Sequence, residues 1–283
     1  MARTPTLTKL CFWITAILTL AGVTLRSLSM LLCFDAELGY LDKGILPALS
    51  DAIYPIAVVA AAAIACMIPK GTLPKKLHTP ARLPLSILMG IGFVAFSALG
   101  LILCLPTAKS KLLLAPLLVA LLASLYFFLS AKKDGAFPDW LSLLGFLPIL
   151  WGVTAIAQTY TDMYTPMNSP VKITLQLGFV GLMLILIAEL RFRLSKPAPR
   201  MALALWSMGS FLCLNGSVPV IVAACARVPL NLIHILYAVV LLFGGAYGGY
   251  ILWQFAHTPV SLPAAENPLP YPTEPTPTSD DPD

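Results

Sequence analysis

Eight long runs of apolar residues are the feature that most constrains how this chain folds. Each run is about as long as the ~20 residues that an α-helix needs to cross ~30 Å of hydrocarbon. Of its 283 residues, 58% are hydrophobic and 11% are charged, whereas soluble domains carry roughly 25% charged residues. A soluble all-α protein would need polar helix faces, which these runs lack. The sequence therefore predicts an all-α, polytopic membrane protein with transmembrane helices at 10–33, 52–68, 83–105, 112–130, 140–160, 172–190, 201–224 and 230–255.

The distribution of Lys and Arg predicts the orientation of these spans. If the N-terminus is cytoplasmic, the loops and helix ends on that side contain 12 of the 18 basic residues, and the opposite side contains six. Cytoplasmic segments of membrane proteins are enriched in basic residues, so this orientation is favoured. An even number of spans then places the C-terminus in the cytoplasm as well, whereas an odd number would place it outside.

The two halves of the chain repeat several short features in the same order. A Gly-Val-Thr sequence at 22–24 recurs at 152–154, and an Asp follows each of them near the outer face, at Asp35 and Asp162. Basic loops then lead into helices with a Met-Gly pair, at 89–90 and 208–209. This order predicts two parallel four-helix repeats, residues 1–133 and 134–257, related by an axis along the membrane normal. A binding site is expected where such halves meet.

The C-terminal residues 258–283 differ in character from the rest of the chain. They include eight Pro and five acidic residues, and none is Lys or Arg. Such a stretch cannot bury enough apolar area to fold, so a disordered, Pro-rich, acidic cytoplasmic tail is predicted. A P-x-x-P pattern at 272–275 could dock a protein partner, and a solvated tail without a partner is the alternative.

Ionisable and polar residues inside the spans are the candidate binding residues, because burying them in a membrane is costly and each marks a site by default. Arg26 lies roughly 24 Å along the first helix at ~1.5 Å per residue. It faces a ligand, extends its side chain to the interface, or pairs with Asp35, Glu37 or Asp51 at the outer face. His234 either joins it or is a satisfied packing residue. Five residues of the predicted outer half form a set with a cationic bias: Arg26, Lys172, Gln176, Asn215 and His234.

Three other patterns predict structural features of the spans. Glu189 and Arg193 are four residues apart in the favourable acid-first order, which predicts an interfacial ion pair rather than a proton-relay carboxylate. The segment 215–219 ends in Pro219 and predicts a kink in the seventh helix. The Gly-rich segment 244–249 contains overlapping G-x-x-x-G patterns, which predict close helix packing.

Catalytic, metal and nucleic-acid signatures are missing from the sequence. It contains no H-E-x-x-H, G-x-S-x-G, Walker or dinucleotide-binding motif, so an intramembrane enzyme is disfavoured and no cofactor is expected. None of the six Cys forms a C-x-x-C pair, and no His or Cys stands at zinc-ligand spacing. No basic surface with interleaved aromatic residues indicates nucleic-acid binding.

The segments 34–40 and 162–172, together with Gln176 and the segment 189–192, resemble an uncharacterised group of bacterial multi-pass membrane proteins, chiefly from Gram-positive anaerobes. The resemblance implies a bacterial plasma membrane and supplies no activity. Two functions therefore stay open. One is a transporter-like or ligand-binding protein with an outward-facing site for an anionic or polar small molecule or a lipid headgroup. The other is a non-transporting sensor, scaffold or accessory subunit.

Overall fold

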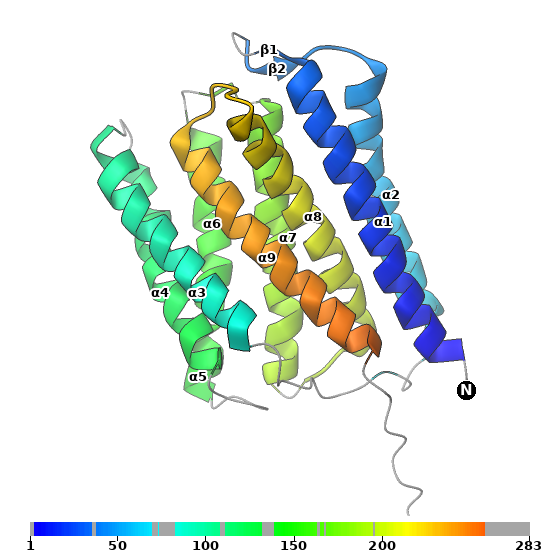
Figure 1. The fold of residues 1–283 in the computed structure, drawn as a ribbon. Coiled ribbons are helices and arrows are strands. Elements are labelled where there is room, and N and C mark those ends of the chain that lie inside the picture. Colours follow the sequence, from blue (N-terminus) through cyan, green and yellow to red (C-terminus); the bar gives the residue numbers. More distant parts are fainter. Residues whose placement is uncertain are drawn as a thin grey trace, which may run out of the picture.

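The protein folds into a bundle of long helices that run up and down between two ends (Figure 1). The computed structural model describes residues 3–35, 38–69, 73, 83–107, 111–131, 139–162, 165–166, 168–194 and 196–257. Among these residues, eight helical segments are long and apolar enough to cross a membrane, which confirms the predicted number of spans. Their bounds lie within a few residues of the prediction, except that the second span begins at Ile45 rather than at 52. The predicted tail lies outside the described residues.

Two of the spans depart from a single regular helix. The fifth is built from two helices that meet at Gly145, and the third ends in a π-helical turn followed by a 3-10 turn. The elements are α1 (Arg3–Leu32), β1 (Phe34–Asp35), β2 (Tyr40–Leu41), α2 (Ile45–Met67), α3 (Leu83–Leu99), η1 (Gly100–Cys104), η2 (Leu105–Thr107), η3 (Lys111–Leu113), α4 (Leu114–Ala131), α5 (Asp139–Leu144), α6 (Phe146–Thr161), α7 (Pro170–Arg193), α8 (Pro199–Cys225) and α9 (Leu232–His257).

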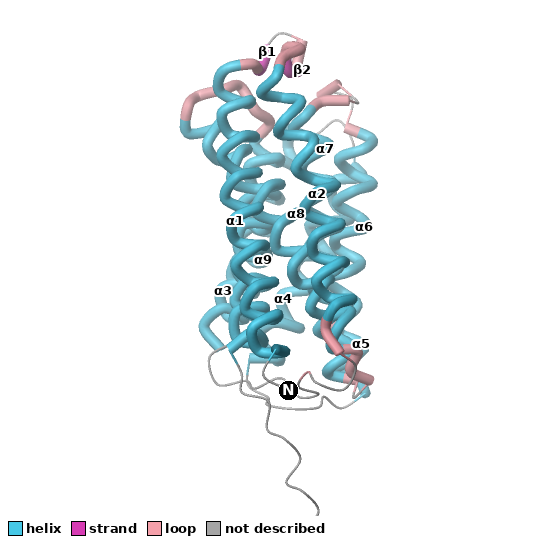
Figure 2. The backbone as a smooth tube through the Cα atoms, turned by 90° about the vertical axis from the view of Figure 1, so that its right-hand side faces the viewer, coloured by secondary structure: helices cyan, strands magenta, loops and turns pink. Residues whose placement is uncertain are grey.

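The last three helices form the centre of the bundle. The α8 helix packs against α1, α2, α7 and α9, while α3 and α4 pack against α9 and α6 respectively. The α1–α2 pair therefore lies on one side and the α3–α4 pair on the other (Figure 1), and Figure 2 views the bundle from the α1–α2 side. In the most apolar window of each span, 61% of the residues are buried in α7 and α8 but only 22% in α1. The core sits around α7, α8 and α9.

The packing shows hairpins that the predicted repeats share, but it does not show two four-helix halves. The neighbours α1 and α2 pack together as α6 and α7 do, and α3 and α4 pack together as α8 and α9 do. However, the close packing of α7 on α8 has no counterpart of similar extent between α2 and α3 in the described part of the chain. The duplication stays a prediction.

The two ends of the bundle differ. The terminal end holds the start of α1 and the end of α9, so both termini of the helical part lie on the same side (Figure 1). The opposite, hairpin end holds the antiparallel β1–β2 ribbon, in which Phe34 pairs with Leu41. Gly39 turns this ribbon with a φ of 72°, a left-handed conformation that favours glycine. A Cβ there would lie 3.0 Å from Pro166 Cγ, so the ribbon rests on the α6–α7 loop.

Glycines bring α7 and α8 into backbone contact. A Cβ on Gly216 would lie 2.7 Å from the carbonyl oxygen of Thr174, and one on Gly181 would lie 2.7 Å from that of Gly209. The predicted packing role of the glycines in α9 is confirmed at Gly244, Gly245 and Gly248, where an added Cβ would meet neighbouring side chains within 3 Å. Small residues of this kind are what allow helices to approach closely without the hydrophobic effect.

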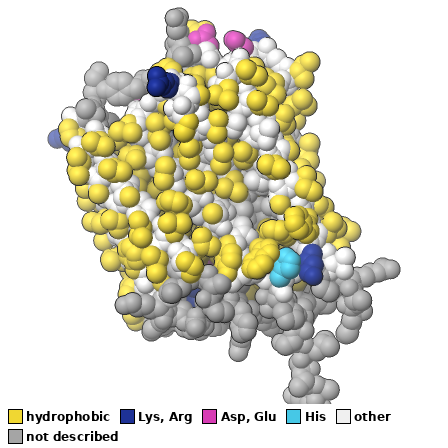
Figure 3. All heavy atoms as spheres, in the orientation of Figure 1, with side chains coloured by type: hydrophobic (Ala, Val, Ile, Leu, Met, Phe, Trp, Pro, Cys, Tyr) yellow, Lys and Arg dark blue, Asp and Glu magenta, His cyan; other side chains and the backbone are white. Residues whose placement is uncertain are grey.

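The outer surface of the bundle is apolar between its two ends. Figure 3 shows hydrophobic side chains over most of the visible face, with charged groups near the ends. Leu20 is 70% exposed and Ile17 is 64% exposed, both on α1. Such a surface suits contact with lipid rather than water. The α8 helix continues through Pro219 from Pro199 to Cys225, and the kink predicted at this residue stays a prediction.

Candidate functional site

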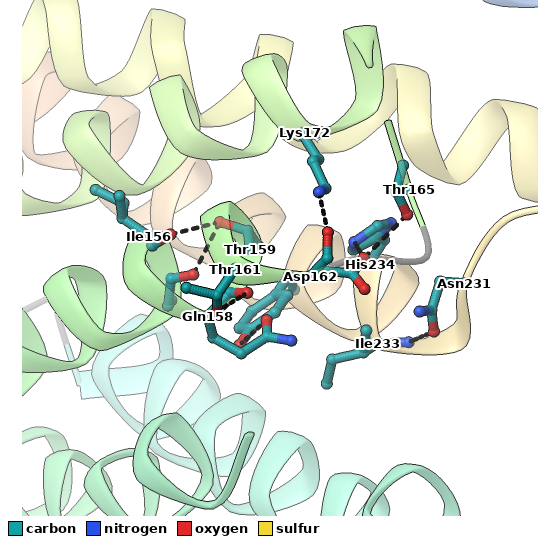
Figure 4. Close-up of polar contacts among 12 residues, drawn as sticks. Ile156, Gln158, Thr159, Thr161, Asp162, Thr165, Lys172, Asn231, Ile233 and His234 are labelled. Carbon is teal, nitrogen blue, oxygen red and sulfur yellow. Dashed lines mark hydrogen bonds and ion pairs between the residues drawn. The ribbon is translucent and has the colours of Figure 1, made fainter. Parts of the chain in front are cut away.

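Two of the predicted site residues, Lys172 and His234, converge on Asp162 at the hairpin end (Figure 4). The Lys172 ammonium donates a hydrogen bond to the backbone carbonyl of Asp162. The His234 Nε2 atom lies 3.5 Å from Asp162 Oδ2, and the Thr165 hydroxyl donates to the same carboxylate oxygen at 3.0 Å. Three helices thus contribute to one cluster, which we call the Asp162 cluster (Asp162, Thr165, Lys172 and His234).

Helix ends place these side chains. The α6 helix ends at Thr161, and Asp162 continues the chain with extended dihedral angles. The α7 helix begins at Pro170, a residue that suits the first helical position because its missing N–H is not needed there. At the start of α9, the side-chain oxygen of Asn231 accepts a hydrogen bond from the Ile233 N–H at 3.2 Å. Lys172 and His234 therefore lie within the first turn of their helices, close to the end of α6.

The Asp162 cluster is buried but not fully satisfied. Lys172 and His234 are each 1% exposed, and the Asp162 side chain is 5% exposed. The geometry at His234 Nε2 does not make a hydrogen bond to Asp162 despite the short distance, and the buried Ser169 hydroxyl also has no hydrogen-bond partner. Because most buried polar atoms in proteins are hydrogen-bonded, such exceptions call for an explanation. They are groups with which a polar ligand or a water molecule can bond.

From the Asp162 cluster towards the terminal end there is one further side-chain hydrogen bond, and beyond it lie aromatic rings. The Tyr237 hydroxyl donates to Gln158 Oε1 at 3.1 Å. The Tyr237 ring lies 5.0 Å from that of Phe179 and 4.9 Å from that of Phe96, and both of these rings also contact Trp151. This aromatic layer fills the bundle between the Asp162 cluster and the terminal end.

Arg26 of α1 contacts a different face of α7 from the one that carries Lys172. Its guanidinium donates to Asp51 Oδ1 at 2.8 Å, to the Ser50 hydroxyl at 3.2 Å and to the Pro170 carbonyl at 3.4 Å. Residues two apart in a helix point about 200° apart at ~3.6 residues per turn, so Pro170 and Lys172 face different neighbours. Arg26 is 3% exposed, whereas the Asp51 side chain is 68% exposed. Arg26 thus ties α1, α2 and α7 together next to water.

Asn215 and Gln176 complete the predicted set, and neither joins the Asp162 cluster through a direct contact seen in the described residues. Asn215 is fully buried in α8, where its Nδ2 donates to the Phe211 carbonyl at 2.9 Å. Its Oδ1 has no hydrogen-bond partner and lies against Gly22 of α1, whose added Cβ would be 2.5 Å away. Gln176 is half-buried, one helical turn beyond Lys172.

The central residue of the cluster is not among the predicted site residues. Asp162 belongs to the repeated pattern of the two halves, but it falls just beyond the fifth span. A signal was present: an acidic residue directly after one span and a Lys near the start of the next are joined by a loop of only a few residues. Opposite charges so placed can meet without crossing the bundle.

A second buried group of charges lies near the terminal end. The predicted Glu189–Arg193 ion pair is confirmed, with Arg193 Nη2 3.3 Å from Glu189 Oε1. Both side chains are buried inside the bundle, with exposures of 0% and 5%, rather than spread on its surface. The Tyr247 hydroxyl of α9 donates to Glu189 Oε2 at 2.7 Å. This Glu189 group (Glu189, Arg193 and Tyr247) locks α7 to α9.

Neither group forms a metal site among the residues that the structure describes, since no three His, Cys, Asp or Glu side chains there could hold a metal ion. Compared with known protein families, with curated proteins and with solved structures, the chain shows no match. The resemblance of its loop segments to bacterial membrane proteins therefore stays an expectation. The function has to be argued from the geometry.

Proposed function

We propose that the protein is a transporter-like or ligand-binding membrane protein that takes an anionic or polar small molecule at the Asp162 cluster. The observation that carries this proposal is the convergence of three ionisable side chains from different helices in a buried place. Ionisable groups at such positions are costly and are retained mainly at functional sites. The unpartnered His234 Nε2 and Ser169 hydroxyl add hydrogen-bonding capacity that the folded chain does not use.

The charged groups of the Asp162 cluster contact one another in this structure. Lys172 is held by a carbonyl and His234 lies beside a carboxylate, so an incoming anion would compete with Asp162 for both of them. The β1–β2 ribbon contacts the adjacent α6–α7 loop at Pro166, and the aromatic layer around Tyr237 fills the bundle towards the terminal end. This arrangement corresponds to an occluded state in which a ligand site is formed but not open to either side.

Ligand-dependent stabilisation of the purified protein tests the proposal. Sodium phosphate, glutamate and glycerol 3-phosphate would be added at matched ionic strength, with sodium chloride as the reference, and thermal unfolding recorded. A ligand at 100 times its Kd stabilises the folded state by about 2.7 kcal/mol. We expect at least one of these anions to stabilise the protein, and Lys172→Met and His234→Gln to lose this effect.

Lys111→Met provides the matched control, because Lys111 is an exposed basic residue at the same end of the bundle. It should respond to the anion as the unmodified protein does. Equal stabilisation of the Lys172→Met variant would overturn the assignment of the site. Uptake of the stabilising anion into vesicles that contain the protein would then separate a transporter from a binding protein.

A non-transporting sensor or scaffold is the second candidate. It is favoured by the local pairing of the charges, since Arg26 is held by Asp51 and Lys172 by the Asp162 carbonyl. Its protein partner would meet the basic loops or the tail 258–283. In that case none of the anions stabilises the protein, and deletion of the tail removes a co-purifying protein.

We also infer that the membrane is a bacterial plasma membrane, that both termini are cytoplasmic and that the chain arose by a four-plus-four duplication. The excess of Lys and Arg on the terminal side supports the orientation, and the shared α1–α2 and α6–α7 hairpins support the duplication. Labelling single Cys variants at Lys9 and Lys43 from outside intact cells tests the orientation. Only the Lys43→Cys variant should react.

A further inference from the structure

A groove on the membrane-facing side of the bundle is lined by none of the five predicted site residues. It has a volume of about 440 Å³ and runs between α1, α8 and α9. Its walls include Phe12, Leu20 and Val23 of α1, Leu214 and Val218 of α8, and Trp253 of α9. The groove opens on one side, on the face that Figure 3 shows. It belongs to spans that contact lipid, so what fills it must be apolar.

The groove walls are almost wholly apolar. Two of their three hydroxyl groups are turned back onto their own helices: Thr19 donates to the Thr15 carbonyl and Ser210 to the Trp206 carbonyl, each at 2.7 Å. Along α1 the groove extends from Phe12 to Val23, or roughly 17 Å at ~1.5 Å per residue. One leaflet of the hydrocarbon core is about half of ~30 Å thick. The groove therefore matches a single acyl chain that enters from the terminal end.

The terminal end of the groove carries basic groups. The His257 ring lies 6.2 Å from that of Phe12 and 5.2 Å from that of Trp253, at the groove mouth. Lys9 is exposed and lies one turn before Phe12 on α1. The Cys11 thiol lies 3.3 Å from the Ser207 hydroxyl, which brings the start of α1 beside the first turns of α8, where Arg200 stands. Each of the three helices thus brings one basic residue to this end.

No acidic residue offsets these groups within the three helices. The sequences of α1, α8 and α9 contain no Asp or Glu over their whole length. We propose that the groove binds one acyl chain of an anionic phospholipid, whose phosphate meets Lys9, Arg200 and His257. Charge complementarity at the rim and hydrocarbon complementarity in the groove support the same ligand. The site is separate from the Asp162 cluster, and the proposal does not depend on the proposed function.

Gly249 allows a direct test because it faces the groove and has nothing within 4 Å of the position its Cβ would take. A Gly249→Phe variant therefore fills the groove without a clash in the helix. Ala246→Phe is the matched control, since Ala246 is exposed on α9 and does not line the groove. A further variant, Lys9→Gln with His257→Gln, removes two of the three rim groups and leaves the groove-lining residues unchanged.

Native mass spectrometry of the detergent-purified protein would measure binding of dioleoylphosphatidylglycerol against dioleoylphosphatidylcholine. Each basic residue near an anionic headgroup contributes a preference of about five-fold. We expect the unmodified protein and Ala246→Phe to prefer the anionic lipid, Gly249→Phe to lose its bound lipid, and the rim variant, which keeps Arg200, to lose most of the preference between headgroups.

Three results would overturn the proposal. The first is equal binding of the two lipids by the unmodified protein. The second is unchanged lipid binding by Gly249→Phe. The third is a change of oligomeric state in Gly249→Phe with no change in bound lipid, which would assign the groove to a second copy of the chain.

Discussion

At the terminal end of α7, Glu189 and Arg193 form an ion pair within one helix, whereas at the hairpin end Lys172 depends on the Asp162 carbonyl in the preceding loop. Both oxygens of the Glu189 carboxylate are engaged, one by Arg193 and the other by Tyr247. The terminal end thus holds an ion pair within one helix that α9 also contacts, and the hairpin end joins a loop to two helices. Each end keeps a buried nitrogen that makes no hydrogen bond, Arg193 Nε at the terminal end and His234 Nε2 at the hairpin end.

The largest expected effect comes from breaking the terminal-end pair. Glu189→Leu leaves the buried Arg193 without its carboxylate, and removal of one partner from a buried ion pair costs about 3–5 kcal/mol. The free energy of unfolding in mixed micelles, followed by Trp fluorescence during a titration with dodecyl sulfate, measures this loss. Glu189→Gln keeps an acceptor for Tyr247 and should lose less. A loss below about 1 kcal/mol, the range of exposed ion pairs, would show that water reaches the pair.

The same measurement on Asp162 sharpens the contrast. Asp162→Ala removes the acceptor of the Thr165 hydroxyl and the contact with His234, but it keeps the backbone carbonyl that holds Lys172. We expect a loss of about 1–2 kcal/mol, the range for one or two hydrogen bonds. Asp162→Asn, which keeps an oxygen acceptor, should lose less still. If Asp162→Ala were as destabilising as Glu189→Leu, the hairpin end would be as tightly sealed as the terminal end, and the contrast would fail.

The eight spans could be predicted from the sequence because their signal is local. An apolar run long enough to cross the membrane identifies a helix without any knowledge of its neighbours. The arrangement of the helices could not be predicted in the same way. The separation of the α1–α2 and α3–α4 pairs by the later helices depends on side-chain shape, such as the contact of Gly181 with Gly209. Glycines occur in several spans, and the sequence does not indicate which of them meet.

In the candidate site too, contacts within one helix could be predicted and contacts between separate helices could not. The Glu189–Arg193 pair was predictable because residues four apart share a helix face. The Asp162 cluster needed the relative placement of α6, α7 and α9, so only Lys172 and His234 were named in advance. For Arg26 the sequence left a ligand-facing cation, a side chain extended to the interface and a pair with one of three acidic residues open, and the structure shows the pair with Asp51. The face of α7 that Arg26 contacts depends on how α1 and α2 pack, and the sequence does not reveal this packing.

The smallest expected effect compares two tyrosines of α9, Tyr237 within the aromatic layer and Tyr247 nearer the terminal end. Tyr237→Phe removes the hydrogen bond to Gln158 and keeps the ring contacts, so the loss should be about 0.6 kcal/mol, the average for side-chain hydrogen bonds in a membrane protein. Tyr247→Phe removes a hydrogen bond to the Glu189 carboxylate, and bonds to charged acceptors are stronger. The same titration should therefore show a larger loss for Tyr247→Phe. Equal losses would mean that the Glu189 carboxylate is neutralised or hydrated, and the terminal end would then resemble the hairpin end in having capacity to bind.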